Sequence, residues 1–464
     1  MIRTWSPPVS ACFAKRDTPW TDLHIRCNHG RCAEAWKRAG QAPEIANRDR
    51  SSDLREPTAR TEPMKTFQSM QKPTHTAVRL VLFLFCLLLL SCSTVPEKAD
   101  LLRPTPAGCL PFFPDRDGWY GGDGAYSIGL NDGRVLWLFG DTFVSDEEGR
   151  RDRTNMKVVL GTTLAVSTCA ADSGFQIRYW LKKNNGEFVS SFGEKEWLWP
   201  QDPFLVGRVL YIPLLSIKAN PEMPGPFKFE IAGHKFARIE NFEHADPNRW
   251  TVEYLDLTPG IPKEIRAFAT TAVAFRDYVY FYPLYGATRN GVSVLGNILA
   301  RIPVGKLDDP ARAIEYLTGN GQWEKAPDPL KVKVVFGAAV SELSVRYHPG
   351  IGKWIAVYLS VRNNGDRMLY QTADVPEGPW SEPGILFAPV PEVERGSTRY
   401  DRNNFCYAGK EHPEFARDRT LVVTYVCNSH EDFEKKTSFI RGNLFLYRPV
   451  VNRVRISDEG MQMK

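Results

Sequence analysis

Short strand-like runs recur along most of this chain, and no segment of useful length has the apolar period of an amphipathic helix. The runs are Tyr126–Leu130, Val135–Phe139, Val158–Ser167, Val209–Leu215, Phe236–Ile239, Ala269–Phe275, Tyr278–Tyr285, Ile298–Ile302, Leu343–Tyr347, Trp354–Val361, Met368–Thr372, Phe405–Ala408, Leu421–Val426 and Asn443–Tyr447. They form five clusters that begin near Asp123, Asp202, Arg266, Glu342 and Cys406, at intervals of 79, 64, 76 and 64 residues. Each interval can hold a four-stranded sheet with long loops. The pattern predicts an all-β fold, a five-bladed β-propeller, with a pair of β-sandwiches as the alternative.

Composition and strand patterning agree with this fold class. The 464 residues include 12 Trp, 17 Tyr, 26 Phe, 35 Gly and 34 Pro, and 43% are hydrophobic, which excludes a disordered or collagen-like chain. The run Val135–Phe139 reads Val-Leu-Trp-Leu-Phe, so both of its faces are apolar. Such a strand suits blades that pack face to face better than a half-solvated sheet, whose strands would alternate.

An apolar run of eleven residues, Leu80–Leu90, follows a basic segment. It is too short to cross a bilayer, which takes roughly 20 residues, but it has the length of a secretory signal core. The letters LLSC that end at Cys92 resemble the lipobox of bacterial lipoproteins, which implies cleavage before Cys92 and lipid attachment to its thiol. The alternative is an ordinary signal peptide with an incidental cysteine. Ser93 replaces the aspartate that retains lipoproteins in the inner membrane, which favours the outer membrane, on its periplasmic or surface side.

The leader also sets the expected domain boundaries. Residues 1–63 have no apolar periodicity, and we interpret them as a misread start without a fold of its own. They are followed by a signal peptide over 64–91, a Pro-rich membrane tether over 92–114, a propeller over 115–450 and a tail over 451–464. Residues 1–91 hold 14 basic and 8 acidic residues, so the +5 of the whole chain belongs to the leader. The remainder is nearly neutral, which excludes nucleic acid as the expected partner.

Four cysteines belong to the expected mature domain: Cys109, Cys169, Cys406 and Cys427. An exported protein can form disulfides, and three pairings are open. The sequence has no P-loop, G-x-S-x-G, H-E-x-x-H, C-x-x-C or repeated Asp-box motif. No cofactor is therefore expected, apart from a structural Ca²⁺ that the centre of a propeller could hold.

The first two strand-like runs flank Asn131-Asp132-Gly133, a strong hairpin signal. With a three-residue loop, Leu130 pairs with Arg134, and Asp123 then lies opposite Asp141 on one side of the sheet. A two-residue loop would send the two carboxylates to opposite faces. Opposed carboxylates raise each other's pKa, which suits acid–base catalysis, and they could also bind a cation. The alternative is that each aspartate caps local backbone at a strand end.

The stretch Gly121–Phe143, GGDGAYSIGLNDGRVLWLFGDTF, resembles the first-blade signature of a family of exported five-bladed propellers known only as a domain of unknown function. Some relatives of that family are glycoside hydrolases, the endo-D-arabinanases. Looser matches lie at Trp199–Phe204, Ser341–Tyr347, Gly378–Pro383, Tyr407–Glu414 and Val423–Asn428. The resemblance implies that Asp123 and Asp141 are the catalytic carboxylates. It also likens Glu342 to the general acid of arabinan-cleaving propellers, although Glu342 could instead bind backbone at a strand end.

Five further residues are weaker candidates for sugar binding. Asp202, Arg266 and His412 stand at or near cluster starts, where they could bind hydroxyls, and Trp119 and Tyr120 could stack on a sugar ring. His412 could equally be a structural histidine whose ring nitrogens have partners, and the two aromatic residues could instead be loop side chains that cover the core as packing lids.

We therefore predict a monomeric, exported lipoprotein that cleaves a furanoside-containing, arabinan-like polysaccharide by carboxylate acid/base catalysis. The alternative is a non-catalytic lipoprotein that binds glycans at the surface. A structural envelope protein, with a plugged or apolar centre, is a third hypothesis.

Overall fold

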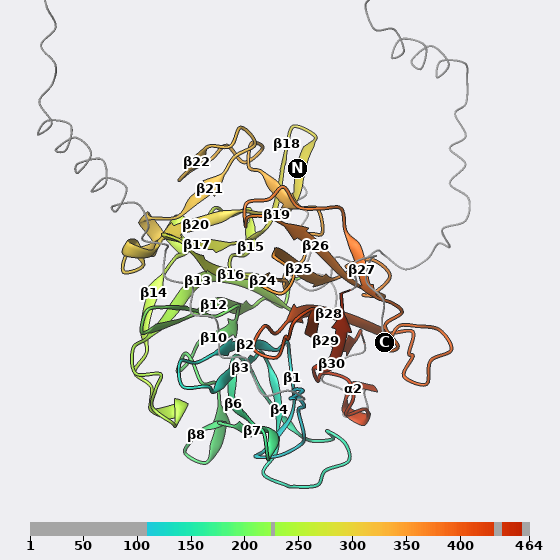
Figure 1. Ribbon diagram of the computed structural model, residues 1–464. Coiled ribbons are helices and arrows are strands. Elements are labelled where there is room, and N and C mark those ends of the chain that lie inside the picture. The colour runs from blue at the N-terminus through green and yellow to red at the C-terminus, as the bar shows by residue number, and fades with distance from the viewer. Residues whose placement is uncertain (1–108, 224–227, 431–438, 457–464) are drawn as a thin grey trace, which may run out of the picture. The chain divides into compact units, whose positions relative to one another are not determined.

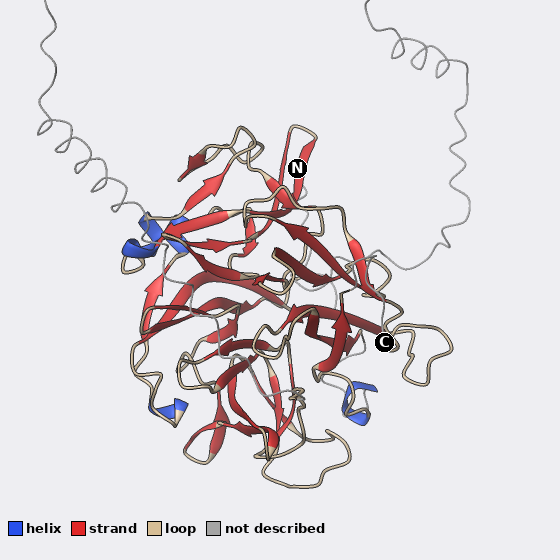
Figure 2. Cartoon of the chain, in the orientation of Figure 1, coloured by secondary structure: helices blue, strands red, loops and turns tan. Residues whose placement is uncertain are grey.

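The computed structural model describes residues 109–223, 228–430 and 439–456. The predicted leader, the lipidation site Cys92, the tether as far as residue 108 and the end of the tail lie outside these residues. Within them nearly all regular structure is strand, as Figure 2 shows, so the all-β prediction is confirmed. This described part of the chain holds no helix that is long and apolar enough to span a membrane.

Five large antiparallel sheets follow one another along the chain (Figure 1), and we name them I to V. Sheet I contains β2 (Tyr126–Gly129), β3 (Val135–Phe139), β6 (Thr163–Ala170) and β7 (Gly174–Tyr179). Sheet II contains β10 (Trp197–Pro200), β11 (Phe204–Val206), β12 (Val209–Ala219), β13 (Phe229–Ile239) and β14 (Glu253–Asp256). Sheet III contains β16 (Ala272–Phe275), β17 (Tyr278–Phe281), β20 (Ala300–Pro303), β21 (Glu315–Leu317) and β22 (Trp323–Glu324). Sheet IV contains β24 (Ser344–His348), β25 (Lys353–Leu359), β26 (Met368–Ala373) and β27 (Gly384–Phe387), and sheet V contains β28 (Asn404–Glu411), β29 (Thr420–Ser429) and β30 (Val450–Arg455).

Three further sheets lie beside sheets I to V. The first contains β1 (Trp119–Gly122), β4 (Thr142–Val144) and β5 (Lys157–Val159); the second, with four strands, contains β15 (Ile265–Ala267), β18 (Leu284–Arg289), β19 (Val292–Ile298) and β23 (Val334–Phe336); and the third contains β8 (Lys182–Asn184) and β9 (Glu187–Val189). The described helical turns are η1 (Pro247–Arg249), η2 (Thr258–Gly260), η3 (Val304–Lys306), η4 (Pro310–Arg312) and α2 (Phe439–Gly442).

Most predicted strand-like runs coincide with strands, and four differ. Ile298–Ile302 divides at Leu299 between β19 and β20, which belong to different sheets. Val158–Ser167 divides into β5 and β6 around Gly161, whose φ of 112° suits glycine. Tyr278–Tyr285 divides at Pro283, which lacks the N–H that a continuous ladder needs, into β17 and β18 of different sheets. Asn443–Tyr447 is a turn segment, and the last strand is instead β30, which continues past the predicted domain end at residue 450.

The first hairpin has the predicted three-residue loop. The N–H of Leu130 donates to the carbonyl of Arg134 at 2.7 Å, and Gly133 has a φ of 86°, in the left-handed region. Tyr126 pairs with Leu138, which is the predicted register. This register places Asp123 and Asp141 on neighbouring chain segments at the open end of the hairpin.

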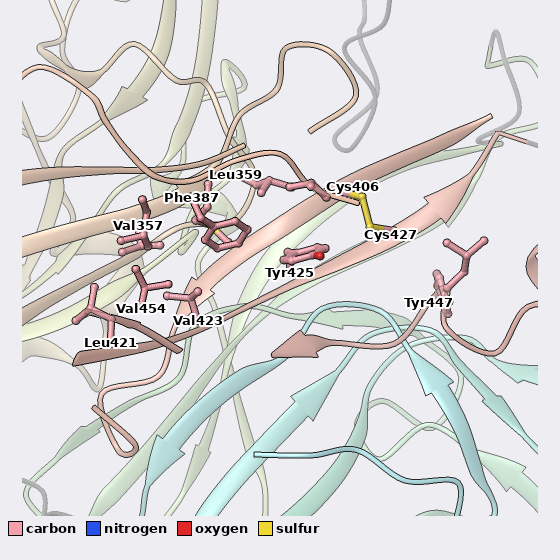
Figure 3. Close-up of a cluster of buried hydrophobic side chains, with 14 of the residues drawn as sticks. Val357, Leu359, Phe387, Cys406, Leu421, Val423, Tyr425, Cys427, Tyr447 and Val454 are labelled. Atoms are coloured by element: carbon pink, nitrogen blue, oxygen red, sulfur yellow. A yellow bond between two sulfur atoms is a disulfide. The ribbon is translucent and has the colours of Figure 1, made fainter. Parts of the chain in front are cut away.

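Neighbouring large sheets bury apolar side chains between them. Leu136 and Leu164 of sheet I belong to one cluster with Leu210 and Ile212 of sheet II. Similar clusters join sheet II to sheet III and sheet III to sheet IV. Figure 3 shows the cluster between sheets IV and V, where β25 faces β29. Burying one large aliphatic side chain contributes about 1.5–3 kcal/mol, so these apolar contacts on both sheet faces hold the sheets together.

Arg153 links the two ends of the described chain. Its side chain is fully buried, and the guanidinium donates to the carbonyl of Tyr120 at 2.8 Å and to four carbonyls within residues 440–446 at 2.7–3.3 Å. Gly121 makes room for it, because a Cβ there would lie 2.5 Å from Nη2 of Arg153. Sheet V contacts sheet I as well, where Phe415 stacks on Trp137. The first and last sheets are therefore neighbours.

Two disulfides select one of the three open pairings. Cys109 bonds to Cys169 of β6, and Cys406 of β28 bonds to Cys427 of β29. The first bond ties the start of the described chain to sheet I, and the second joins two paired strands of sheet V.

Candidate active site

Asp123 and Glu342 line one small cavity of about 40 Å³ at the starts of sheets I and IV. Asp123 precedes β2, and Glu342 stands two residues before β24. The walls come from sheet II, β15 and the first hairpin, and the lining residues are Asp123, Gly124, Tyr126, Gly140, Trp199, Pro200, Gln201, Leu215, Ala267, Ser341 and Glu342. Side chains that are distant in the sequence thus converge on one polar hollow.

Asp123 is held by both its backbone and its carboxylate. Its N–H donates to the carbonyl of Asp141 at 3.1 Å, and the N–H of Gly140 donates to the carbonyl of Asp123 at 2.7 Å. The hydroxyl of Tyr407 donates to Oδ1 of Asp123 at 2.5 Å. Burial raises the pKa of Asp123 to about 6, while the bonds from Tyr407 and from the N–H of Gly124 oppose the rise.

Glu342 is the second carboxyl group of the cavity. The hydroxyl of Ser341 donates to its Oε2 at 2.7 Å. Burial raises the pKa of Glu342 to about 7; the Ser341 bond lowers it, the negative charge of Asp123 adds to the rise, and the ammonium of Lys410 opposes it. Between about pH 6 and 7, Asp123 is therefore mostly ionised while Glu342 mostly keeps its proton, which is the division of roles that acid–base catalysis needs.

Asp141 is not among the residues that line this cavity. One of its oxygens, Oδ1, accepts three N–H bonds: from Gly161 at 2.7 Å, from the indole of Trp197 at 2.9 Å and from the indole of Trp199 at 2.8 Å. Burial raises the pKa of Asp141 to about 7, and these three donors oppose the rise. Asp141 thus fixes two tryptophans, of which Trp199 forms part of the cavity wall.

Asp202 was predicted to bind sugar hydroxyls, but its side chain is buried and engaged. Its carboxylate contacts Arg346 Nη2 at 2.9 and 3.1 Å, and it accepts bonds from Thr271 Oγ1 at 2.7 Å and from the N–H of Ala272 at 3.0 Å. Burial raises the pKa of Asp202, but Arg346, Lys410 and these donors outweigh it and hold the pKa below its usual range. We assign Asp202 to the packing between sheets.

His412 is also buried, and both ring nitrogens have partners. Nδ1 lies 2.7 Å from Ser127 Oγ, and Nε2 lies 2.7 Å from Thr424 Oγ1. Burial lowers the pKa of His412 to about 3, so the ring is neutral. We assign it to the core, which was the alternative interpretation of this histidine.

The remaining predicted binding residues lie away from the cavity. Trp119 is fully buried and stacks on Tyr179, with ring centroids 4.5 Å apart. Tyr120 is 2% exposed, and its hydroxyl donates to the carbonyl of Glu147. Neither ring has a free face for a sugar. Arg266 lines a different hollow of about 390 Å³, together with His234.

Three residues near the site were missed by sequence reasoning: Tyr407, Arg346 and Lys410. Arg346 is a partly buried charge within β24, and Lys410 is a buried charge within β28. A charge inside the first strand of a cluster was the available signal.

The described residues offer one group of potential metal ligands, Glu392 with Cys406 and Cys427. Both sulfurs are in a disulfide, so they cannot act as thiolate ligands. This group does not fit the structural Ca²⁺ considered from the sequence, because that ion prefers oxygen ligands.

A family model described as "Domain of unknown function (DUF5005)" matches residues 111–457. The chain belongs to this family. No curated protein matches this DUF5005 chain.

Three solved structures are similar to the DUF5005 domain, and the first of them, with a TM-score above 0.5, shares its fold. A candidate hydrolase from Bacteroides ovatus is 17% identical, with a TM-score of 0.53 over 74% of this chain and 93% of the other. The GH43_1 enzyme from Xanthomonas citri, complexed with xylotriose, is 14% identical, with a TM-score of 0.40 over 75% and 91%. The exo-beta-1,3-galactanase from Phanerochaete chrysosporium, with beta-1,3-galactotriose, is 10% identical, with a TM-score of 0.40 over 74% and 63%. At these identities the likeness concerns fold and not activity.

Proposed function

We propose that this DUF5005 domain is a glycoside hydrolase in which Asp123 is the base or nucleophile and Glu342 is the general acid. The observation that carries the proposal is that these two carboxyl groups line one cavity and have raised pKa values near 6 and 7. We interpret sheets I to V as the five blades of a propeller. The site then lies where the first strands of blades I and IV begin.

In the proposed reaction, protonated Glu342 gives its proton to the glycosidic oxygen as the bond to the sugar carbon breaks. The Asp123 carboxylate either attacks that carbon directly or takes a proton from the attacking water. The hydrogen bond from Tyr407 keeps Asp123 ionised at neutral pH. Asp141 acts through Trp199, because its Oδ1 fixes the indole that forms part of the cavity wall.

For the substrate, we propose a furanoside-containing polysaccharide similar to arabinan. The support is the first-hairpin signature around Asp123 and Asp141, which resembles that of endo-D-arabinanases. The fold shared with a candidate hydrolase agrees with a hydrolytic reaction.

We also propose that Cys92 carries a lipid that anchors the monomeric protein to the outer membrane. The support is the apolar run Leu80–Leu90 and the lipobox-like letters that follow it. Cys92→Ser should release the protein from the membrane fraction, and mass spectrometry should find acyl chains on the unchanged protein. Equal membrane recovery of both proteins would refute the anchor.

Activity should be tested with the exported chain carrying Cys92→Ser, incubated with a panel of arabinans and other glycans whose products are separated by size. Asp123→Asn and Glu342→Gln should each abolish cleavage, while Asp374→Asn, at an exposed position, should leave it unchanged. Asp141→Asn should only reduce cleavage. If Asp141→Asn abolishes cleavage and Glu342→Gln does not, the acid role belongs to Asp141. Binding of a glycan without products would instead favour a non-catalytic glycan-binding protein.

A further inference from the structure

Lys410 is a buried cation that the proposed reaction does not use. It lies on β28 of sheet V, and its residue is 2% exposed. The ammonium donates to the carbonyl of Leu343 at 2.8 Å and to the carbonyl of Thr270 at 3.1 Å. A lysine that donates to two backbone carbonyls in the interior is bound much as a small cation would be.

The same ammonium reaches two more sheets. It lies 3.6 Å from Oδ1 of Asp202 and 4.2 Å from the ring centroid of Tyr126. Tyr126 belongs to sheet I, Asp202 stands between β10 and β11 of sheet II, Thr270 precedes sheet III and Leu343 precedes sheet IV. Lys410 therefore contacts one residue of sheet I and one residue beside a strand of each of sheets II, III and IV.

Two of these contacts lead directly to the proposed site. Leu343 follows Glu342 in the chain, so the bond from Lys410 fixes the backbone that carries the general acid. Tyr126 lines the cavity, and its ring lies against the ammonium. Ser344 adds a further link between β24 and β28, because its Oγ accepts the N–H of Glu411.

The charges that face Lys410 come from several elements. Asp202 and Glu342 favour the charged ammonium, and Arg346 disfavours it. Burial is the largest influence and lowers the pKa of Lys410 to about 8, so the group is mostly charged at neutral pH. In return, its charge lowers the pKa of Glu342.

We propose that Lys410 is a positioning residue whose ammonium acts as a built-in cation, joining β28 of sheet V to residues in or beside sheets I to IV and holding Glu342 in its catalytic place. Its removal leaves a cation site that a small ammonium ion of the same shape can refill. The link to catalysis rests on the proposed function, whereas the cation site does not.

The cation site is tested with Lys410→Ala in the Cys92→Ser chain, with the thermal unfolding midpoint as the readout. The substitution removes the equivalent of n-propylammonium, so adding that ion should raise the midpoint of Lys410→Ala and leave the unchanged protein unaffected. n-Propanol, which has a similar shape and no charge, should not raise the midpoint of Lys410→Ala. Lys353→Ala, at a partly exposed ion pair with Asp374, is the matched control and should not respond to either compound. Equal rescue by propanol and propylammonium, or rescue by neither, would overturn the cation site.

Lys410→Met keeps most of the side-chain volume without the charge, and it covers the case in which the alanine variant does not fold. Carbon-13 NMR titration should show a higher pKa for Glu342 in this variant, and an unchanged pKa would contradict the electrostatic role.

If cleavage is established, the cleavage rate of Lys410→Met should fall about 100-fold, mainly in kcat, because a displaced acid slows proton transfer. The alkaline limb of the pH profile should move to higher pH, since Glu342 keeps its proton longer. An unchanged kcat and an unmoved alkaline limb would refute the positioning role of Lys410. A chain that never cleaves a glycan would refute the proposed function, but the rescue experiment would still decide whether the cation site exists.

Discussion

The carboxyl group of Glu342 is largely shielded from solvent and cannot easily lose its proton, so its ionisation should cost stability that can be measured without a substrate. Its pKa rises from the ordinary 4.5 to about 7 in the folded protein. At about 1.4 kcal/mol per pKa unit, this difference corresponds to about 3 kcal/mol. Because the folded state binds this proton more tightly than the unfolded state does, stability falls as the pH rises from about 4.5 to about 7. Above pH 7 the full loss is present.

Glu342→Gln removes the charge and keeps the shape. We expect the variant to be more stable than the unchanged protein by up to about 3 kcal/mol near pH 8, and equally stable near pH 4, where the native carboxyl is protonated. Urea unfolding followed by tryptophan fluorescence at both pH values measures the difference. Glu382→Gln, at an exposed glutamate, is the control and should change stability by less than about 0.5 kcal/mol. A Glu342→Gln protein no more stable than its parent near pH 8 would refute the reasoning.

Three further predictions concern the surroundings of this site. Asp202→Asn leaves two cations without their counter-charge and should lower the free energy of unfolding by about 3–5 kcal/mol. Asp374→Asn, in an exposed ion pair, should lower it by at most about 1 kcal/mol. Urea unfolding measures both losses, and similar values for the two variants would contradict the prediction. Tyr407→Phe removes a hydrogen bond that lowers the pKa of Asp123, so the acidic limb of the pH–activity profile should move above about pH 6. An unmoved limb would show that the ionisation of Asp123 does not cause it. Cys169→Ser removes the disulfide to the start of the described domain and should lower the free energy of unfolding by about 2–5 kcal/mol. Under reducing conditions the variant and the unchanged protein should be equally stable, and an equal loss there would contradict this prediction.

Local rules were enough to predict the first hairpin. Asn131-Asp132-Gly133 fixes the loop, the loop fixes the register, and the register brings the backbone of Asp123 beside that of Asp141. The apolar strand-like runs likewise identified most strands, because a strand buried on both faces is apolar along its whole length.

The direction of a side chain could not be predicted in the same way. Asp141 accepts bonds from Gly161 and from two indoles of β10, and none of these donors is fixed by the hairpin itself. Lys410 depends on partners in sheet I and in the segments that adjoin sheets II, III and IV, so no local pattern around it could indicate its role. Such groups become evident only once the sheets are assembled.

The guanidinium of Arg153 has a consequence for the order in which the molecule forms. Its carbonyl partners are Tyr120 and, 287 to 293 residues after Arg153 in the chain, residues within 440–446. Contacts so distant in sequence carry a large loop-closure entropy and tend to form late. A chain that is synthesised from its N-terminus would therefore hold Arg153 without most of its acceptors until the final segment arrives. The fold cannot close before residues 440–446 have been made, and a truncated product would expose this unsatisfied cation to quality-control proteases.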